Sequence, residues 1–428
     1  MSLEWETFEL NDICILNKSS YSKKDDWKFI NYLDTKNITK GKINEIKYLN
    51  PNEDTIPSRA KRKVVNKDII YSTVRPNQEH YGLIENAPEN LLVSTGFTTI
   101  TVDTRKAIPE FVYYFITQNH ITESLQTIAE QSTTSYPSIR PSNIGDLIIS
   151  LPNLHTQKKI SSILTNIEHK IKVNENINNN LEEQIETIYN SFFVYYDDFS
   201  KEELEECEIG LIPKTWNLIS LGELTTQIKE KVKNNEYPVF SAVNTGNLIL
   251  SEEYFDKQVF SKSIEKYIVV KQKEFAYNPA RINIGSIGRN EFDFVGCVSP
   301  VYVGFKVEEG YENFMNMFIK SKQFNQWVIM LASGSVRQTL NYADFSIIKI
   351  PYPPKYLIEK FNIIYESYYE LINHNKAMIN NLEKIRDILL PKLMSGEIDV
   401  SKINCDLKLI IKKIILKFIN PIIWRILI

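Results

Sequence analysis

The sequence predicts an α+β protein in which two similar globular domains are separated by two long helices that form a coiled coil. The first observation behind this prediction is that the chain repeats itself with a period near 200 residues. The second is that each repeat ends in a long stretch whose apolar residues follow a heptad pattern. The third is composition, because 428 residues with 43% hydrophobic and 24% charged side chains suffice for two or three domains with buried cores.

The repeat is visible in short segments that recur at nearly constant spacing. WETFELNDI begins at Trp5, and WNLISLGEL begins at Trp216. KDIIYSTVR ends at Arg75, and the matching KEFAYNPAR ends at Arg281, 206 residues later. Each half then reaches a short apolar segment that ends in proline, LIISLP at 147–152 and IIKIP at 347–351. A duplication of this kind predicts two domains of the same fold.

A long helix is predicted after each of these apolar segments. Over about residues 155–193, an unbroken 4-3-4-3 alternation runs through Ile160, Leu164, Ile167, Ile171, Asn174, Asn178, Leu181, Ile185, Ile188 and Phe192. The alternation recurs 201 residues later, at Phe361, Tyr365, Tyr368, Ile372, Asn375, Ile379, Leu382, Arg386, Leu389 and Leu393. So narrow a seam is typical of a coiled coil, and the natural partner of each helix is the other. The alternative is two separate helices, each packed on its own domain.

Two asparagines, Asn174 and Asn375, occupy equivalent positions of the seam. A seam asparagine lowers stability but fixes register, because only one alignment lets the amides pair. If the helices run antiparallel, we expect these two residues to approach each other, whereas the alternative for Asn174 is a solvated break. About 38 helical residues at ~1.5 Å each make a rod of roughly 57 Å, somewhat over one DNA turn of ~34 Å. That length suits two separated DNA half-sites, and it fits a scaffold for two protein partners equally well.

The two globular halves, 1–150 and 210–350, mix short strands with one clear helix each. In the first half, strands are predicted at 63–65, 68–72, 91–93, 98–102 and 145–151, and a helix runs from Pro109 to about Ala129. The second half repeats this with strands within 294–307 and a helix over 313–331.

Several classes of function lack the residues that they need. Cys14, Cys207, Cys297 and Cys405 lie far apart with no CxxC spacing, which argues against a zinc cluster and against a disulfide framework, and favours a cytoplasmic location. The five histidines include no HExxH, and no Walker loop, GxSxG or GxGxxG occurs. The N-terminal segment MSLEWETFEL lacks the apolar run of a signal peptide. We therefore expect no catalytic and no metal-binding residues in this chain.

The net charge of −3 conceals an asymmetry. Residues 196–210 carry seven acids and one lysine, a net charge of −6, so the rest of the chain sums to +3. We interpret this acidic stretch as a solvated linker. Five cations and no acid lie between Arg59 and Lys67. Such a cluster can neutralise DNA phosphates, and the alternative is a solvated loop.

Polar loops carry the residue types that read DNA. Arginine, asparagine and glutamine make bidentate contacts with guanine and adenine, whereas serine, threonine and tyrosine commonly reach phosphates. Such residues gather around Arg75 and in 132–140, and again around Arg281 and in 333–341, although a structural salt bridge is the alternative for the two arginines. The candidate DNA-binding residues are Arg59, Lys61, Arg62, Lys63, Tyr71, Arg75, Asn77, Gln78, Ser132, Thr133, Thr134, Tyr136, Arg140, Tyr277, Asn278, Arg281, Asn283, Arg289, Ser333, Ser335, Arg337, Gln338 and Asn341.

Over residues 1 to about 400 the chain resembles the specificity subunit of type I restriction-modification enzymes. The resemblance is carried by KDIIYSTVRPN and LLVSTGFTTI (within 67–100), SYPSIRPSNIGDLIISLP and HTQKKISSIL (within 135–164), NNLEEQIETIYNSFF (179–193) and, above all, IRDILLPKLMSGEIDV (385–400). It implies two target-recognition domains that each read one half of a bipartite DNA site. It also implies an antiparallel pair of spacer helices with pseudo-twofold symmetry, and a subunit that performs no chemistry itself.

The resemblance further implies the domain boundaries and the partners. The domains are a first target-recognition domain at 1–152, a first spacer helix at 153–195, an acidic linker at 196–212, a second target-recognition domain at 213–351, and a second spacer helix at 352–400. The implied partners are double-stranded DNA, two methyltransferase subunits, and restriction (motor) subunits that join through the assembled complex. No cofactor is implied for this chain, because S-adenosylmethionine, ATP and magnesium belong to the partner subunits.

After SGEIDV the chain departs from the family pattern with a basic, apolar extension at 401–428. From Leu407 onward it has five cations and no acid in 22 residues, which argues against a membrane span. The alternatives are a membrane-surface helix and a partner-binding or poorly ordered extension. Two other functions stay open from the residues alone. One is a coiled-coil scaffold that binds proteins without DNA, and the other is a stand-alone DNA-modifying enzyme, which needs a cofactor or metal motif that we do not find.

Overall fold

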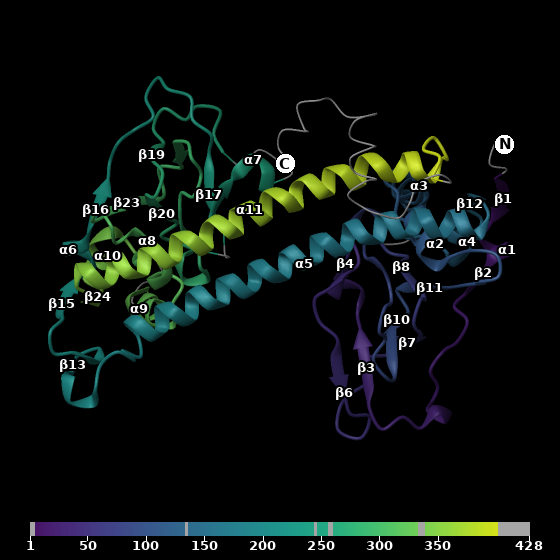
Figure 1. Ribbon diagram of the computed structural model, residues 1–428, viewed down its shortest axis with the longest axis horizontal. Coiled ribbons are helices and arrows are strands. Elements are labelled where there is room, and N and C mark those ends of the chain that lie inside the picture. The colour runs from purple at the N-terminus through teal and green to yellow at the C-terminus, as the bar shows by residue number, and fades with distance from the viewer. Residues whose placement is uncertain (1–4, 133–135, 244–245, 256–259, 333–338, 401–428) are drawn as a thin grey trace. The chain divides into compact units, whose positions relative to one another are not determined.

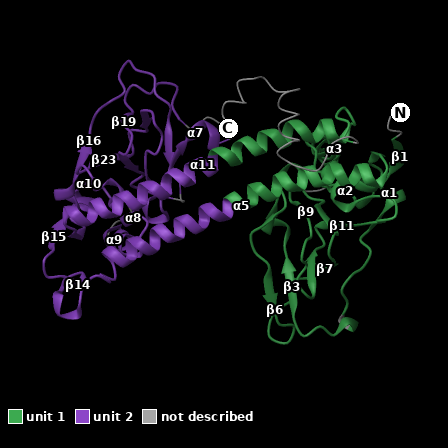
Figure 2. Ribbon diagram, in the orientation of Figure 1, with its two compact units in different colours: residues 1–174, 377–428 green, residues 175–376 purple. Residues whose placement is uncertain are grey.

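The computed structural model describes residues 5–132, 136–243, 246–255, 260–332 and 339–400 (Figure 1). They form two compact units, the first from the described parts of 1–174 and 377–428 and the second from those of 175–376 (Figure 2). Helix α5 (Leu154–Phe193) begins in the first unit and ends in the second, and α11 (Lys355–Met394) does the reverse. Each unit therefore contains part of both long helices together with its own set of sheets.

The first unit is built on two four-stranded sheets. One has the order β6 (Lys47–Leu49), β3 (Ile30–Leu33), β10 (Leu91–Ser94), β7 (Ala60–Lys63), and the other β2 (Cys14–Leu16), β11 (Phe97–Val102), β8 (Ile69–Ser72), β9 (Tyr81–Leu83). Two antiparallel pairs accompany them, β1 (Glu6–Glu9) with β12 (Ile148–Leu151) and β4 (Ile38–Thr39) with β5 (Lys42–Ile43). The short helices are α1 (Leu10–Ile13), α2 (Pro109–Ile116), α3 (Asn119–Glu130) and α4 (Pro141–Gly145), with 3₁₀ turns η1 (Lys23–Asp25), η2 (Thr35–Asn37) and η3 (Pro76–Gln78).

The second unit has one four-stranded sheet and several strand pairs. The sheet has the order β16 (Thr225–Ile228), β23 (Val303–Val307), β20 (Phe275–Tyr277), β21 (Ile287–Arg289). The pairs are β13 (Leu204–Cys207) with β14 (Gly210–Pro213), β15 (Asn217–Ser220) with β24 (Lys349–Tyr352), β17 (Phe240–Ala242) with β18 (Leu248–Leu250), and β19 (Ile268–Val270) with β22 (Gly296–Val298). The helices are α6 (Leu221–Leu224), α7 (Ser251–Tyr254), α8 (Glu312–Phe318), α9 (Lys322–Ala332) and α10 (Tyr342–Ser346), with η4 (Lys201–Glu203) and η5 (Ile282–Ile284).

The two units share a topology, which confirms the predicted α+β fold with two similar domains. The sheet β2-β11-β8-β9 of the first unit has the same order along the chain and the same antiparallel pairing as β16-β23-β20-β21 of the second. The pair β1–β12 corresponds to β15–β24, which joins the first and last strand of each globular part. Because each globular part is closed by its own terminal strands, its chain enters and leaves beside a long helix.

The helix predicted over about 109–129 is in fact two helices, α2 and α3. Gln118 between them is extended, with a ψ of 142°. The Thr117 hydroxyl donates to the Tyr113 carbonyl oxygen (2.9 Å) and the Gln118 amide donates to that of Phe115 (3.3 Å). The Tyr113 carbonyl oxygen also accepts from the Thr117 backbone N–H (3.2 Å), so the regular helical bonds reach Thr117 and the extended backbone of Gln118 ends them.

The helix predicted over 313–331 is divided in the same way, into α8 and α9. Here the Ser321 hydroxyl oxygen accepts a hydrogen bond from the Phe324 backbone N–H (3.1 Å), as the residue before a helix commonly does. The apolar pattern hid these breaks, because buried apolar residues lie on both sides of each one, Ile116 and Ile121 in the first unit and Ile319 and Phe324 in the second.

The long helices pack against each other within each unit, as predicted. In the first unit, Leu164 and Ile167 of α5 share a core with Leu389 and Leu393 of α11. In the second unit, the ring of Tyr189 on α5 lies 6.1 Å from that of Phe361 on α11. Later residues of α5 thus face earlier residues of α11, so the segments run antiparallel. None of the described helices is both long enough and apolar enough to cross a membrane.

The buried face of the helices is wider than the predicted seam. Tyr189 and Phe193 lie outside the heptad pattern, yet both are buried. The Phe193 ring lies 5.1 Å from Phe314 of α8 and 5.2 Å from Phe361 of α11. The sequence offered packing on the other long helix and packing on a globular domain as alternatives. One face of α5 does both, because Phe193 contacts α11 and α8 together.

Asn375 pairs with Asn178, which corrects the predicted pairing with Asn174. The Asn375 amide nitrogen donates to the Asn178 amide oxygen (2.9 Å), whereas the Asn174 amide nitrogen is buried with no partner among the described residues. Because the helices are antiparallel, a step towards the C-terminus of α5 is a step towards the N-terminus of α11. Positions that are equivalent in the repeat then fall in different layers, and the layer of Asn375 contains Asn178.

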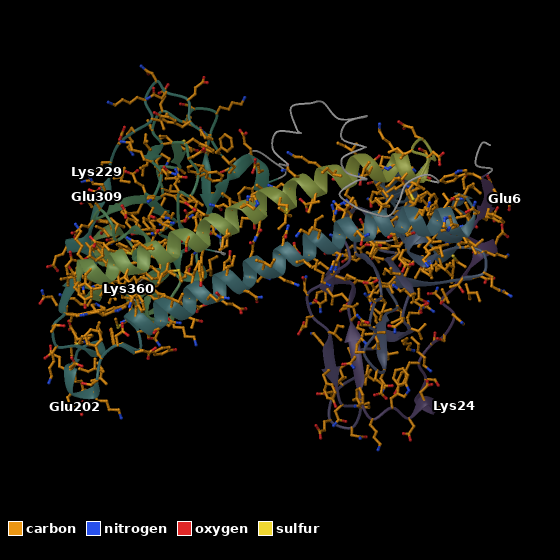
Figure 3. All side chains as sticks on the ribbon, in the orientation of Figure 1. Glu6, Lys24, Glu202, Lys229, Glu309 and Lys360 are labelled. Carbon is orange, nitrogen blue, oxygen red and sulfur yellow. The ribbon has the colours of Figure 1, made fainter. Side chains whose placement is uncertain are left out.

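The acidic segment after α5 folds into η4 and the hairpin β13–β14. Leu204 and Ile212 of this segment pack against the core of the second unit. Its glutamates face outward, and Glu202 lies on the outer surface of η4 (Figure 3). The negative charge of the segment is therefore solvated while its apolar residues anchor it.

Replacing Glu168 of α5 by glutamine is expected to remove a pH dependence of stability in the first unit. Its carboxylate accepts a hydrogen bond from the Tyr114 hydroxyl (3.2 Å). Burial raises the pKa of Glu168, and this effect exceeds the lowering by the Arg386 charge and by the Tyr114 hydrogen bond. Because the folded-state pKa lies above the unfolded one, stability falls as pH rises from the unfolded pKa through the folded one.

Urea unfolding at about pH 5 and about pH 8 measures this effect. The Glu168→Gln variant should lose less stability between the two values than the wild type, and it should be the more stable protein at the higher pH. Glu123→Gln on α3 is the matched control, because Glu123 is exposed. Equal pH slopes for Glu168→Gln and the wild type would contradict the role assigned to burial.

Candidate nucleic-acid interface

Two polar loops predicted to bind DNA are brought together in the first unit. The loop after β8 reaches Arg75, and the second loop runs through Ser138, more than 60 residues later. The Arg75 backbone N–H donates to the Pro137 carbonyl oxygen (2.9 Å), and the Ile139 N–H donates to that of Thr73 (2.8 Å). Val74 and Ser138 form a β-bridge between these bonds. The two loops therefore act as one surface element.

Arg75 itself is held in an unusual backbone conformation. Its φ of 48° and ψ of 71° lie in the left-handed region, which costs a residue other than glycine about 1–3 kcal/mol and is often found at functional sites. Its guanidinium carbon lies 5.3 Å from the centre of the Tyr136 ring, and both side chains are exposed. Asn77 and Gln78 follow in η3 and are also exposed. Arginine, tyrosine and two amides are thus presented together to solvent.

Residues that the sequence did not single out hold this loop in place. The Thr73 hydroxyl donates to the Gly96 carbonyl oxygen (2.9 Å), and the Gln126 side-chain oxygen of α3 accepts from the Asn77 backbone N–H (3.2 Å). Gln126 lies 49 residues from Asn77 in an ordinary amphipathic helix. No sequence signal marks its role, because only the packing of α3 beside η3 creates the contact.

The second unit repeats the junction of two loops after β20. The Leu340 backbone N–H donates to the Pro279 carbonyl oxygen (3.1 Å), which joins the loop of Arg281 to the start of α10. The Asn278 side-chain oxygen accepts from the Ala280 N–H (3.1 Å) and shapes the turn. Arg281 is exposed, whereas Asn278 and Asn283 are half-buried. The equivalent position of the repeat therefore presents an exposed arginine in both units.

Three of the candidate residues are buried, which corrects their assignment as DNA contacts. Tyr71 stacks on Tyr81 with ring centres 5.6 Å apart, and burial raises its pKa to about 12. Tyr277 stacks on Phe345 at 5.4 Å. The Arg289 side chain is 2% exposed and forms an ion pair with Glu291 (2.7 Å). Because these side chains lie inside the fold, they have no surface from which to contact DNA.

The basic strand β7 is only partly free to bind phosphates. Lys63 forms an ion pair with Asp25, and its ammonium lies 5.2 Å from the centre of the Trp27 ring. Arg62 is half-buried, and its Nε atom has no hydrogen-bond partner among the described residues. Arg59 and Lys61 are exposed. Because Lys63 is paired within the chain, the exposed cations of this cluster that can reach a phosphate are Arg59 and Lys61.

The remaining candidates lie at the ends of short helices or outside the described residues. The half-buried Ser132 accepts from the Ser138 N–H (3.4 Å), and Arg140 is exposed just before α4. Asn341 caps α10, because its side chain accepts from the Asp344 N–H (3.0 Å). Thr133, Thr134, Ser333, Ser335, Arg337 and Gln338 lie outside the described residues.

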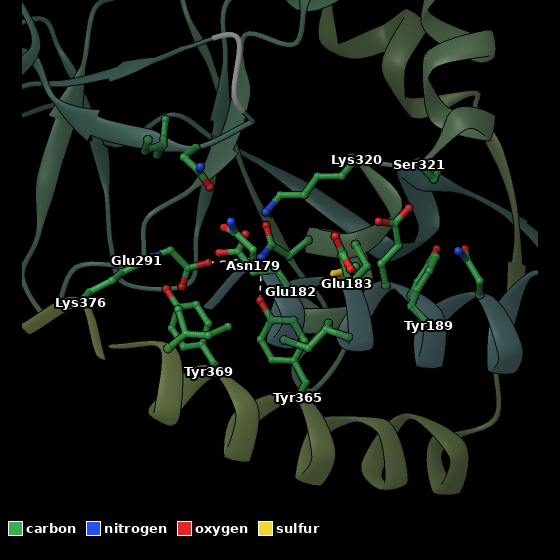
Figure 4. Close-up of a pocket in the computed structure, with 18 of the residues that line it drawn as sticks. Asn179, Glu182, Glu183, Tyr189, Glu291, Lys320, Ser321, Tyr365, Tyr369 and Lys376 are labelled. Atoms are coloured by element: carbon green, nitrogen blue, oxygen red, sulfur yellow. Dashed lines mark hydrogen bonds between the residues drawn. The ribbon is translucent and has the colours of Figure 1, made fainter. Parts of the chain in front are cut away.

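A cavity of about 690 Å³ with a mixed polar and apolar lining lies elsewhere in the second unit (Figure 4). Glu182 and Glu183 of α5 line it on one side, and Tyr365 and Tyr369 of α11 on another, with Glu291 beside them. None of the candidate DNA-binding residues that the structure describes lines this cavity. Among the described residues, no cluster of histidine, cysteine and carboxylate side chains is arranged to hold a metal ion. The two loop junctions present the candidate residues Arg75 and Arg281 to solvent.

Comparison with known proteins gives these junctions a family context. Residues 2–183 match the family model described as the type I restriction modification DNA specificity domain. The HindI specificity subunit of Haemophilus influenzae is 25% identical in an alignment that covers 92% of this chain and 100% of that protein. The MjaIX specificity subunit of Methanocaldococcus jannaschii is 23% identical over 81% of this chain and 84% of its own length.

A solved structure agrees in fold. The type I restriction-modification S subunit from M. genitalium matches with a TM-score of 0.54 and 15% identity, and the match covers 91% of this chain and 96% of the other. The shared architecture thus extends over both repeats and both long helices. Residues 2–183 are thus similar to the DNA specificity domain of type I restriction-modification enzymes, and most of the chain is similar to specificity subunits of that family.

Proposed function

We propose that this chain is the DNA sequence-recognition subunit of a type I restriction-modification complex and that it reads a bipartite site. The observation that carries the proposal is the repeated loop junction, which presents an exposed arginine, Arg75 or Arg281, after the same strand of the same sheet in both units. Arginine side chains on a rigid scaffold are well suited to contact guanine edges or phosphates. Two such surfaces in one chain suit two half-sites.

The proposed domains follow the boundaries that the family resemblance implies. Residues 1–152 and 213–351 serve as the two target-recognition domains, and 153–195 and 352–400 serve as the spacer helices, with the acidic segment 196–212 between them. The proposed contact residues are the exposed or half-buried candidates of both loop junctions, together with Arg59 and Lys61. The chain performs no chemistry of its own in this proposal.

The proposed partners supply the chemistry. Double-stranded DNA binds to the loop junctions, two methyltransferase subunits dock on this chain, and the restriction subunits join through the assembled complex. S-adenosylmethionine, ATP and magnesium then act on the partner subunits. The complex works in the cytoplasm, where the host DNA is the substrate of methylation.

Sequencing of methylated adenines in host DNA tests this function. With the methyltransferase subunit present, DNA from cells that contain this chain should show a two-part methylated motif with a fixed gap, and the motif should vanish without the chain. Arg75→Ala should relax the motif in one half and Arg281→Ala in the other. Arg105→Ala is the matched control, because the Arg105 side chain is 87% exposed and pairs with the neighbouring Asp103. A motif that persists without this chain would overturn the proposal.

A further inference from the structure

Arg75 differs from the neighbouring cations of the first unit in what its side chain contacts. Lys63 is paired with Asp25, Lys67 with Glu85 (2.9 Å) and Glu110 (2.8 Å), and Lys40 with Glu79 (2.9 Å). Arg75 forms no ion pair within the described part of the chain, and its guanidinium lies against the ring of Tyr136 instead. Its positive charge is therefore open to a ligand while its position is held by a neutral side chain.

The backbone of Arg75 is also held in place, by hydrogen bonds on both sides of the residue. Its N–H bonds to Pro137, its carbonyl oxygen accepts from the Gln78 N–H (2.9 Å), and Pro76 follows it directly. Tyr136 belongs to the loop at the other side of this junction and precedes Pro137. The hydrogen bonds that join the two loops thus also bring the arginine and the tyrosine together.

An aromatic ring beside a guanidinium matters because it restricts the orientations that the group can adopt. A phosphate can be bound by lysine as a point charge or by arginine through its fork, so contact with a phosphate does not by itself require a fixed plane. The N7 and O6 atoms of guanine accept two parallel hydrogen bonds, so they require a planar fork in a fixed orientation. An aromatic ring against the guanidinium limits its rotation, so the side chain loses less conformational entropy when it binds.

We propose that Arg75 reads a guanine in the half-site bound by the first unit, and that Tyr136 is the positioning residue that orients its guanidinium. The inference rests on the proposed function, since it assigns one base and two side chains within that site. It separates Arg75 from Arg59 and Lys61, which lie on exposed positions of the basic cluster and have no aromatic ring in contact among the described residues.

The test uses the assembled complex of this chain with its methyltransferase subunits, and DNA that carries the motif found by methylation sequencing. Each guanine of the first half-site is replaced in turn by 7-deazaguanine, which lacks the N7 acceptor but still pairs with cytosine. At one position the replacement should weaken wild-type binding roughly tenfold, within the range known for a bidentate contact. The same replacement should not weaken binding by Arg75→Ala further, because the contact is already lost.

A second pair of variants tests the positioning role of Tyr136. Tyr136→Phe keeps the ring and should keep discrimination between guanine and 7-deazaguanine, whereas Tyr136→Leu should reduce it while leaving the other positions of the motif intact. Arg75→Lys should resemble Arg75→Ala in discrimination, because it keeps the charge but loses the fork. Arg105→Gln should behave as the wild type.

The outcomes separate this inference from the proposed function. If the wild-type complex shows no two-part motif, the proposed function itself fails. If the motif exists but its first half has no position where 7-deazaguanine acts through Arg75, only the guanine assignment fails. Full discrimination by Arg75→Ala would show that Arg75 does not contact that guanine, and unchanged discrimination by Tyr136→Leu would remove the positioning role.

Discussion

Replacing Arg289 by methionine is expected to lower the free energy of unfolding by about 2–3 kcal/mol, because it breaks an ion pair whose arginine is buried and whose glutamate is 26% exposed. The guanidinium donates to both carboxylate oxygens of Glu291 (2.7 and 2.9 Å) and to the Asn313 side-chain oxygen (2.7 Å). It also donates to the Tyr365 hydroxyl of α11 (3.3 Å). Methionine keeps most of the volume, but it leaves Glu291 without its cation and Asn313 without a donor.

The double variant Arg289→Met with Glu291→Gln should recover a large part of this loss, because it removes the unpaired charge as well. The glutamine introduced by the second substitution still offers an oxygen to the Asn316 amide, which donates to Glu291 Oε1 in the native protein (3.3 Å). Arg105→Met should leave the urea unfolding midpoint near that of the wild type, since its side chain is 87% exposed. Equal midpoints for Arg289→Met and the wild type would show that the network does not stabilise the fold.

Replacing Phe361 by alanine is expected to cost about 3–5 kcal/mol, the range for deleting a buried phenylalanine. Phe361 is 1% exposed, and its ring lies 5.2 Å from Phe193 and 6.1 Å from Tyr189, both on α5. The variant loses these contacts and leaves a cavity between the two long helices of the second unit. Urea unfolding measures the loss, and hydrogen exchange should show weaker protection of the α5 backbone around Tyr189.

Ile363→Ala is the matched control for this variant, because Ile363 lies two residues further along the same helix. It is 73% exposed, so its truncation should change the free energy of unfolding by no more than about 0.5 kcal/mol. The difference between the two variants reports on packing between α5 and α11, since both replacements end in alanine on one helix. Similar losses for the two would contradict the packing described for the second unit.

Much of the fold could be predicted because duplication and periodicity are properties of the chain itself. The match of Arg75 with Arg281 marks the repeat. The structure agrees with it, because a 3₁₀ turn follows both β8 and β20. The heptad pattern predicts two long helices whose natural partners are each other. The pattern did not reveal the breaks at Gln118 and Ser321, because apolar residues continue on both sides of each break.

The sequence did not show which candidate residues are buried, because the burial of a strand residue depends on which elements pack over that strand. All four residues of β8 are buried, including Tyr71, whereas Arg75 lies four residues later and is exposed. A strand covered on both faces shows no alternation that would separate inward from outward side chains. The same holds for Tyr277, and for Arg289, whose partner Glu291 lies close in the chain while Asn313 and Tyr365 lie far away.

The repeat, the two long helices, the α+β class and the similarity to specificity subunits could all be predicted from the chain alone, because each of them depends on local patterns and spacings. The tertiary structure alone decided which polar residues meet, since contacts such as Arg75 with Tyr136 and Asn178 with Asn375 join segments far apart in the chain. Antiparallel packing set the asparagine pair, and hydrogen bonds between two loops set the arginine–tyrosine pair. Neither follows from spacing along the chain, because both depend on how separately formed elements come together.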